Sequence, residues 1–165
     1  MAEAVDCQKP QVELLDLDRY AGTWYTYERS CSDCMNLTKC SRASWSKPDQ
    51  NGNSTVIISE FSEISFSLSE VTSKAYIEDN KIINKIYVPA VGTVQLEFWI
   101  LATDYDTYSI VYSCKVDRDK PVIEGVIYTR TRQIDLNMTA IAQNVYNFQK
   151  IEMPAMIKVE QENCF

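Results

Sequence analysis

The sequence predicts an all-β fold, either an up-and-down antiparallel barrel or a sandwich, with one α-helix near its C-terminus. Apolar and polar residues alternate in short runs from the twenties to about residue 130, as in strands with one buried face. Turn-forming residues separate these runs, and no helical pattern lies between them. Consecutive short strands without intervening helices are typical of such barrels and sandwiches.

The alternation is clearest over residues 64–69, where Ile64, Phe66 and Leu68 alternate with serines. A second alternating run, 94–98, continues into the apolar residues 99–102. The other predicted strands cover residues 23–29, 55–61, 81–88, 108–114 and 122–130. The predicted turns between strands lie at residues 48–52, 78–80, 89–92 and 117–121.

The hairpin around residues 104–106 is predicted to be apolar on both faces. A turn centred on Tyr105 and Asp106 places Ile100 opposite Val111 and Phe98 opposite Ser113. One face then holds Phe98, Ile100, Ala102, Ser109, Val111 and Ser113, and the other holds Trp99, Leu101, Ile110 and Tyr112. Both faces must therefore be covered, one of them by the interior of the barrel.

A single later segment changes to the helical period. Its apolar residues Met138, Ile141, Val145 and Phe148 share one helix face, and Asp135 is the predicted N-cap. This face can cover the second side of the hairpin, which places the helix outside the barrel. An extended tail, residues 155–165, follows. No linker or repeat divides the chain, so residues 1–165 are expected to form one domain.

The composition excludes several function classes. The net charge of −7 argues against nucleic acid and anionic membrane surfaces as partners. No apolar run approaches the length of a membrane span, and the polar start of the chain is expected to be that of a mature protein. The chain has no histidine, which removes Ser-His-Asp and Cys-His catalysis, His-ligated haem and His-containing zinc sites. The four glycines form no phosphate-binding loop.

Two features indicate an oxidising, extracellular compartment. The six cysteines are an even number, as expected where disulfides persist. Three glycosylation sequons begin at Asn36, Asn53 and Asn137. The chain is therefore expected to be a secreted glycoprotein.

Three segments resemble the signature motifs of the lipocalin family, in the family's order and spacing. They are residues 22–25, which open the first strand, 103–105 in the hairpin turn, and 128–130 at the end of the last strand. The residues that carry the resemblance are Gly22, Trp24, Thr103, Asp104, Tyr105 and Arg130. The resemblance covers essentially the whole chain and is greatest to the subfamily of apolipoprotein D and the bilin-binding lipocalins.

The resemblance implies an eight-stranded antiparallel up-and-down β-barrel, or calyx, with the C-terminal α-helix packed outside. It also implies that Trp24 and Arg130 pack together at the closed end of the calyx. A guanidinium over an indole ring contributes about 0.5–2 kcal/mol. These two residues are therefore expected to be structural rather than ligand-binding.

The cysteines extend the resemblance. Four of them match the apolipoprotein D pattern, which implies the disulfides Cys7–Cys114 and Cys40–Cys164. Cys31 and Cys34 depart from it. A local Cys31–Cys34 disulfide is expected, and a free thiol that attaches a reactive ligand is the alternative. A metal site would need two further ligands that the chain does not supply, so none is expected.

The barrel interior could be a packed core or hold one small ligand, and periodicity does not separate the two. Ser109 and Ser113 are small, and with the family resemblance they favour a cavity. The residues expected to face a ligand are Phe66, Leu68, Phe98, Ile100, Ser109, Val111, Val126 and Tyr128. The ligand is expected to lie with its apolar body inward and any polar group near the open mouth.

The expected function is extracellular transport of a small apolar ligand. Subfamily resemblance makes a bilin such as biliverdin the first expectation; a retinoid, carotenoid, sterol or fatty acid is the alternative. A pigment-complex subunit, including a homo-oligomer, stays open as a second class. A third is an enzyme with Cys31 or Cys34 as nucleophile and Arg29 or Lys39 favouring the thiolate. Because no histidine can act as the base, catalysis is not expected.

Overall fold

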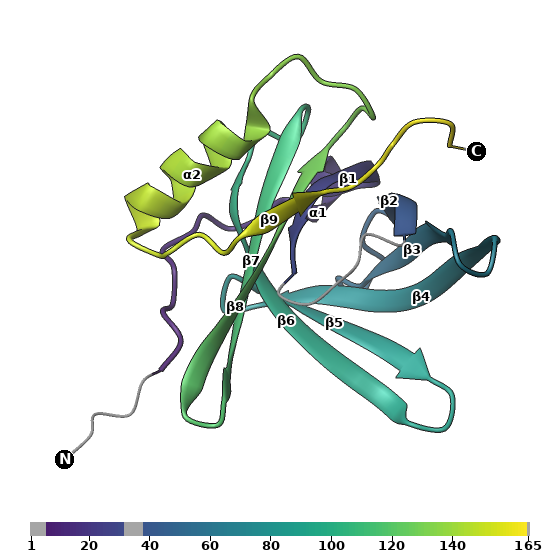
Figure 1. The fold of residues 1–165 in the computed structure, drawn as a ribbon. Coiled ribbons are helices and arrows are strands. Elements are labelled where there is room, and N and C mark those ends of the chain that lie inside the picture. Colours follow the sequence, from purple (N-terminus) through teal and green to yellow (C-terminus); the bar gives the residue numbers. More distant parts are fainter. Residues whose placement is uncertain (1–5, 32–37, 165) are drawn as a thin grey trace.

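The computed structural model describes residues 6–31 and 38–164. Antiparallel strands form one sheet in the order β2-β3-β4-β5-β6-β7-β8-β1-β9, and pairing of β1 with β2 closes β1–β8 into a barrel (Figure 1). The expected eight-stranded up-and-down barrel with an outer helix is thus confirmed. The elements are α1 (Leu17–Tyr20), β1 (Gly22–Ser30), β2 (Thr38–Trp45), β3 (Ser54–Ser62), β4 (Ser67–Glu78), β5 (Lys81–Val88), β6 (Gly92–Thr103), β7 (Tyr108–Asp117), β8 (Lys120–Thr129), α2 (Met138–Gln149) and β9 (Met156–Lys158).

The strand predicted over residues 64–69 is wrong in its first half. Residues 63–66 form the turn between β3 and β4, and β4 begins at Ser67. Phe66 has a positive φ of 51°, and the Ser65 and Ser67 hydroxyls lie 2.7 Å apart across the turn. The alternation therefore came from apolar side chains in an exposed turn, and not from a strand with one buried face.

The register of the β6–β7 hairpin agrees with the prediction at its centre. Ile100 pairs with Val111, and Trp99 pairs with Tyr112. A bulge then shifts the register, so that Ala102 lies opposite Ile110 instead of Ser109. Bulges increase the local twist of a strand and are common at barrel rims.

Two apolar clusters lie on opposite sides of this hairpin. The inner cluster contains Ile100 and Val111 at the closed end of the barrel. The outer cluster contains Leu101 and Ile110, packed against α2. The prediction that both faces of the hairpin are covered, the outer one by the helix, is confirmed.

The helix α2 starts two residues later than predicted and buries a different stripe. Its N-cap is Asn137, whose side-chain oxygen accepts a hydrogen bond from the Ala140 amide; it is not Asp135. The buried positions are Met138, Ala142 and Tyr146, whereas Phe148 is 85% exposed. Residues spaced four apart therefore face the barrel. The predicted helix face turns away from the barrel at its C-terminal end, where Phe148 lies.

Both disulfides that the resemblance implies are present. Cys7 is bonded to Cys114 across 107 residues, and Cys40 to Cys164 across 124 residues. Each joins a terminal segment to a barrel strand, which constrains the unfolded chain strongly. Cys31 also takes part in a disulfide. Cys34, its expected partner, lies outside the described residues.

Neither of the two helices in the described part of the chain is long and apolar enough to cross a membrane.

Candidate functional site

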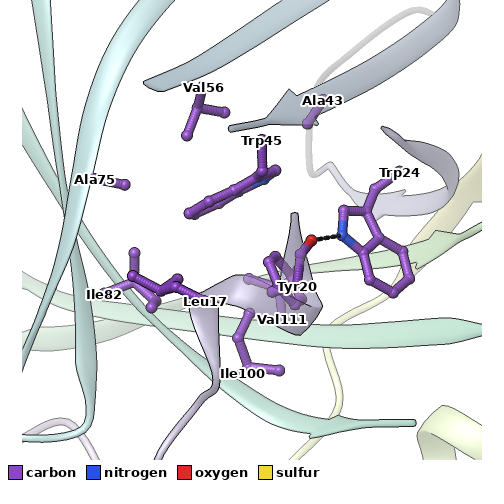
Figure 2. Close-up of a cluster of buried hydrophobic side chains, with 10 residues drawn as sticks. All are labelled: Leu17, Tyr20, Trp24, Ala43, Trp45, Val56, Ala75, Ile82, Ile100 and Val111. Atoms are coloured by element: carbon purple, nitrogen blue, oxygen red, sulfur yellow. Dashed lines mark hydrogen bonds between the residues drawn. The ribbon is translucent and has the colours of Figure 1, made fainter. Parts of the chain in front are cut away.

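Three aromatic side chains form the floor of the barrel (Figure 2). The Tyr20 ring packs against Trp24 at 4.9 Å between centroids and meets Trp45 edge-on at 5.1 Å. Tyr20 comes from α1, which crosses the closed end, and the Trp24 indole N–H donates to its carbonyl at 2.9 Å. The three rings close this end to a ligand.

Arg130 stabilises the floor by contacting Trp24 and the backbone between α1 and β1. Its guanidinium carbon lies 3.7 Å from the centroid of the Trp24 ring, as the family resemblance implies. Its Nη2 donates to the carbonyls of Arg19, Tyr20 and Ala21 at 3.1–3.3 Å. One side chain thus satisfies the carbonyls where α1 turns into β1.

The second motif fixes the turn beside this floor. The Asp104 carboxylate accepts hydrogen bonds from the amides of Asp106, Thr107 and Tyr108 at 2.7–3.2 Å. Partial burial raises the pKa of this carboxyl, but the hydrogen bonds outweigh burial and leave the pKa below its ordinary value. The carbonyl of Tyr105 then accepts from Arg130 Nε at 2.8 Å, which joins the two motifs.

Above the floor lies a cavity of about 330 Å³ that opens between the far ends of the strands. Its volume is at the small end of the range for ligand pockets. The wall is mainly apolar. The lining residues nearest the floor and along both walls include Tyr20, Trp45, Val56, Ile58, Asn84, Phe98, Val111, Val126 and Tyr128.

Four of the eight residues expected to face a ligand line this cavity: Phe98, Val111, Val126 and Tyr128. Ile100 and Ser109 do not. Ile100 packs in the floor cluster, and the buried Ser109 hydroxyl lies 2.8 Å from the Tyr20 hydroxyl. These two therefore support the floor.

Phe66 and Leu68 lie outside the cavity. Phe66 is 79% exposed in the β3–β4 turn, and Leu68 is 45% exposed. In β4 the odd-numbered residues Ser73 and Ala75 are buried, so the even-numbered Leu68 lies on the outer face. The expectation that these two side chains face the interior is wrong, because Phe66 lies in the turn before β4 and Leu68 is at an outward-facing position of β4.

Two residues that line the cavity were not predicted from the sequence: Trp45 of the floor and Asn84 of the wall. Trp45 belongs to β2, a strand that was not predicted because a register shift between Lys39 and Arg42 breaks its alternation. Asn84 interrupts an apolar run on β5 that contains Ile82, Ile83 and Ile86. This interruption could have predicted a polar residue in the cavity. An asparagine between two inward isoleucines places an amide inside the barrel.

The lining near the floor is uncharged, whereas the exposed side chains of Glu97, Lys115 and Glu124 also line the cavity. Burial raises the pKa of Tyr128 to about 12 and also raises that of Tyr20, so both phenols are protonated at neutral pH. A mainly apolar wall above a closed floor can enclose an apolar molecule.

These features define a lipocalin. The chain belongs to the lipocalin / cytosolic fatty-acid binding protein family, whose model matches residues 21–163.

Particular relatives are apolipoprotein D and insecticyanin. Apolipoprotein D of Mus musculus is 32% identical over 161 residues, covering 96% of this chain and 84% of the relative. Insecticyanin-B of Manduca sexta is 25% identical over 139 residues, covering 81% of this chain and 67% of the relative. The solved structure of insecticyanin from the same hornworm has a TM-score of 0.80 and 21% identity, and covers 97% of this chain and 88% of that one. The structural likeness shows a shared fold.

Proposed function

We propose that this protein is an extracellular carrier that binds one small hydrophobic molecule inside its calyx. The observation that carries the proposal is the mainly apolar cavity of about 330 Å³, closed at the Trp24 end and open at the other. Val111 and Val126, which pair across β7 and β8, form one wall of it. Removing an apolar ligand from water into such a cavity is favourable by about 25 cal/mol for each Å² of apolar surface buried.

A bilin such as biliverdin is the first candidate ligand, because the sequence motifs resemble those of the bilin-binding lipocalins. A retinoid, carotenoid, sterol or fatty acid remains the alternative. The cavity volume favours a ligand of modest size, or a longer one whose far end protrudes from the mouth. Assembly into a pigment complex is compatible with either, since it uses the outer surface.

The disulfides support an extracellular location, because such bonds persist where the environment is oxidising. Two proposed glycosylation sites lie at accessible positions, Asn53 beside a surface turn and Asn137 at the start of α2. The third, Asn36, lies outside the described residues.

A role in transport rather than catalysis is supported by the state of Cys31. The thiol-enzyme hypothesis requires a free thiolate at Cys31 or Cys34. Cys31 is disulfide-bonded, and a sulfur in a disulfide cannot act as that nucleophile. With no histidine in the chain, a general base of the usual kind is also missing.

Native mass spectrometry of the protein from its natural source, with a visible absorbance spectrum, tests this proposal. We expect one non-protein mass per chain that is released on denaturation, and a coloured protein if the ligand is a bilin. Substrate turnover by the ligand-free protein, or a ligand mass that survives denaturation as a covalent adduct, would contradict non-covalent carriage.

A further inference from the structure

Tyr128 places a phenol group at the inner end of the cavity. On β8 the inward residues Tyr128, Val126 and Glu124 follow one another from the closed end towards the mouth, and all three line the cavity. The side chain of Tyr128 is half-buried, and Arg130, two residues further along the chain, supports the floor. Tyr128 is therefore the lining residue of β8 that lies nearest the closed end.

The hydroxyl groups on either side of Tyr128 have other partners. Tyr128 lies opposite Ser109 of β7 and opposite Thr26 of β1. The Ser109 hydroxyl is 2.8 Å from that of Tyr20, and the Thr26 hydroxyl donates to Ser41 Oγ at 3.0 Å. Neither neighbour is therefore directed at the phenol of Tyr128.

The Tyr128 hydroxyl is unpaired and open to the cavity. Among the residues that the structure describes, none forms a hydrogen bond with it; burial alone raises its pKa, whereas the bond to Ser109 opposes burial in Tyr20. The hydroxyl is not enclosed either. In the described ranges, the enclosed side-chain polar atoms without a partner belong to Arg29, Ser54, Asn84, Trp99 and Arg132. A molecule in the cavity can therefore contact the oxygen of Tyr128.

Packing does not account for this hydroxyl. The hydroxyl of a buried tyrosine usually has a hydrogen-bond partner. Two other tyrosines follow this rule, because Tyr112 donates to the Gln8 carbonyl at 2.8 Å and Tyr146 donates to the Val111 carbonyl at 3.3 Å. A phenylalanine would fill the position of Tyr128 without placing a polar atom at the inner end of the cavity.

We infer that the ligand carries an uncharged hydrogen-bond acceptor, such as a carbonyl oxygen, at the end that enters the calyx first, and that the Tyr128 hydroxyl donates to it. The inference rests on the proposed carrier function and narrows its ligand class. It favours a ketone, an aldehyde or an amide-type carbonyl, and a plain hydrocarbon offers no acceptor. An ionised carboxylate is disfavoured at this depth, because the lining near the floor supplies no countercharge. The expected orientation, with any polar group near the mouth, is thereby reversed.

Water in the ligand-free cavity can accept the hydrogen bond of Tyr128, and the ligand displaces that water. A ligand with a carbonyl at its inner end replaces the lost bond. A hydrocarbon of the same shape leaves the phenol unpaired and buried beneath it. The position of Tyr128 therefore allows the calyx to discriminate between two apolar ligands that differ in one oxygen atom.

The test compares β-ionone, a small apolar ketone, with the hydrocarbon in which a methylene group replaces its carbonyl. Displacement of the fluorescent probe N-phenyl-1-naphthylamine reports the affinity of both compounds. Tyr128→Phe should weaken binding of the ketone at least about fivefold and change binding of the hydrocarbon by less than about twofold. Tyr108→Phe, the same substitution in the outer cluster, is the matched control and should leave both affinities at the wild-type values.

Infrared spectroscopy gives a direct readout of the bond. The carbonyl stretching frequency of β-ionone should be lower in the wild-type complex than in the Tyr128→Phe complex, because a donated hydrogen bond weakens the C=O bond. The unfolding temperature of ligand-free Tyr128→Phe should equal that of the wild type or exceed it. A clear drop would show that the hydroxyl is structural.

Unchanged affinity of Tyr128→Phe for the ketone would overturn the role of Tyr128 and leave the carrier function standing. Equal weakening for the ketone and the hydrocarbon would also overturn it, because the loss would then come from shape and not from a hydrogen bond. Binding of neither compound by the wild-type protein would overturn both, since a calyx that takes small hydrophobic ligands should accept this pair.

Discussion

The guanidinium carbon of Arg130 lies 3.7 Å from the centroid of the Trp24 ring, and both groups also hydrogen-bond the Tyr20 carbonyl. Trp24 donates to this carbonyl at 2.9 Å from inside the barrel, and Arg130 donates to it at 3.3 Å. The closed end of the calyx is therefore one unit, in which α1, the start of β1 and the end of β8 are fixed together.

Replacing Trp24 of this unit by a smaller residue should destabilise the protein without changing the shape of the cavity mouth. Trp24→Ala should lower the free energy of unfolding by about 3–5 kcal/mol, because a fully buried aromatic ring is lost and a cavity remains. Urea denaturation measures the change. Phe148→Ala, at an exposed apolar position on α2, is the control and should change stability by less than about 0.5 kcal/mol. A Trp24→Ala protein of unchanged stability that no longer binds ligand would mean that Trp24 is a pocket residue.

The acid sensitivity of the β6–β7 turn should depend on Asp104. Its folded-state pKa is below the unfolded value, so the carboxylate stabilises the fold at pH values above the unfolded pKa of about 3.9. This stabilisation is lost as the pH falls through the folded pKa. Asp104→Asn should therefore be less stable than the wild type at pH 7, and the gap should narrow towards pH 3 in thermal melts. A gap that is constant with pH would show that the charge contributes nothing.

The packing of α2 against the barrel requires a glycine at position 125. A Cβ atom there would lie 2.6 Å from the Tyr146 hydroxyl oxygen, which is buried and 3.3 Å from the Val111 carbonyl. Gly125→Ala should destabilise the protein by about 1–3 kcal/mol through overpacking. Adding Tyr146→Phe should recover part of this loss, because the clashing oxygen is removed. Strictly additive changes in a double-mutant cycle would contradict this contact.

Peptide mapping without reductant should recover Cys7 linked to Cys114 and Cys40 linked to Cys164. Intact mass under denaturing conditions should be about two daltons lower for each of three bridges, the third being the proposed Cys31–Cys34 pair. A peptide joining Cys31 to either terminal cysteine would refute this arrangement. A chromophore that stays attached through denaturation would make Cys31 or Cys34 an attachment point.

Much of the fold follows from local sequence pattern. The strand predicted over residues 81–88 coincides with β5, and the pairing of Ile100 with Val111 follows from the hairpin turn. The strand β2 could not be found in this way, because Cys40 adopts a positive φ of 62° and a register shift breaks the alternation around it. Alternation also cannot tell a strand from an exposed turn such as that of Phe66.

The candidate site was less predictable than the fold. The alternation of inward and outward residues correctly placed Val111 and Val126 on the cavity wall. It also predicted that Ile100 and Ser109 face the ligand, although both lie in the floor. Depth along the barrel decides which inward residues meet a ligand, and depth depends on the closure of the sheet. An unpaired atom such as Asn84 Oδ1 becomes evident only when all neighbours are placed.

Binding of the natural ligand to Val111→Trp tests the central claim, that the ligand lies inside the calyx, most directly. Val111 lines the cavity on the inner face of β7, so an indole there fills volume that the ligand needs. Val116→Trp, on the same strand but at an exposed outward position, is the matched control. With both variants shown to be folded by circular dichroism, we predict that Val111→Trp weakens binding at least about tenfold and that Val116→Trp leaves it unchanged. Wild-type affinity in Val111→Trp would contradict a ligand site inside the barrel.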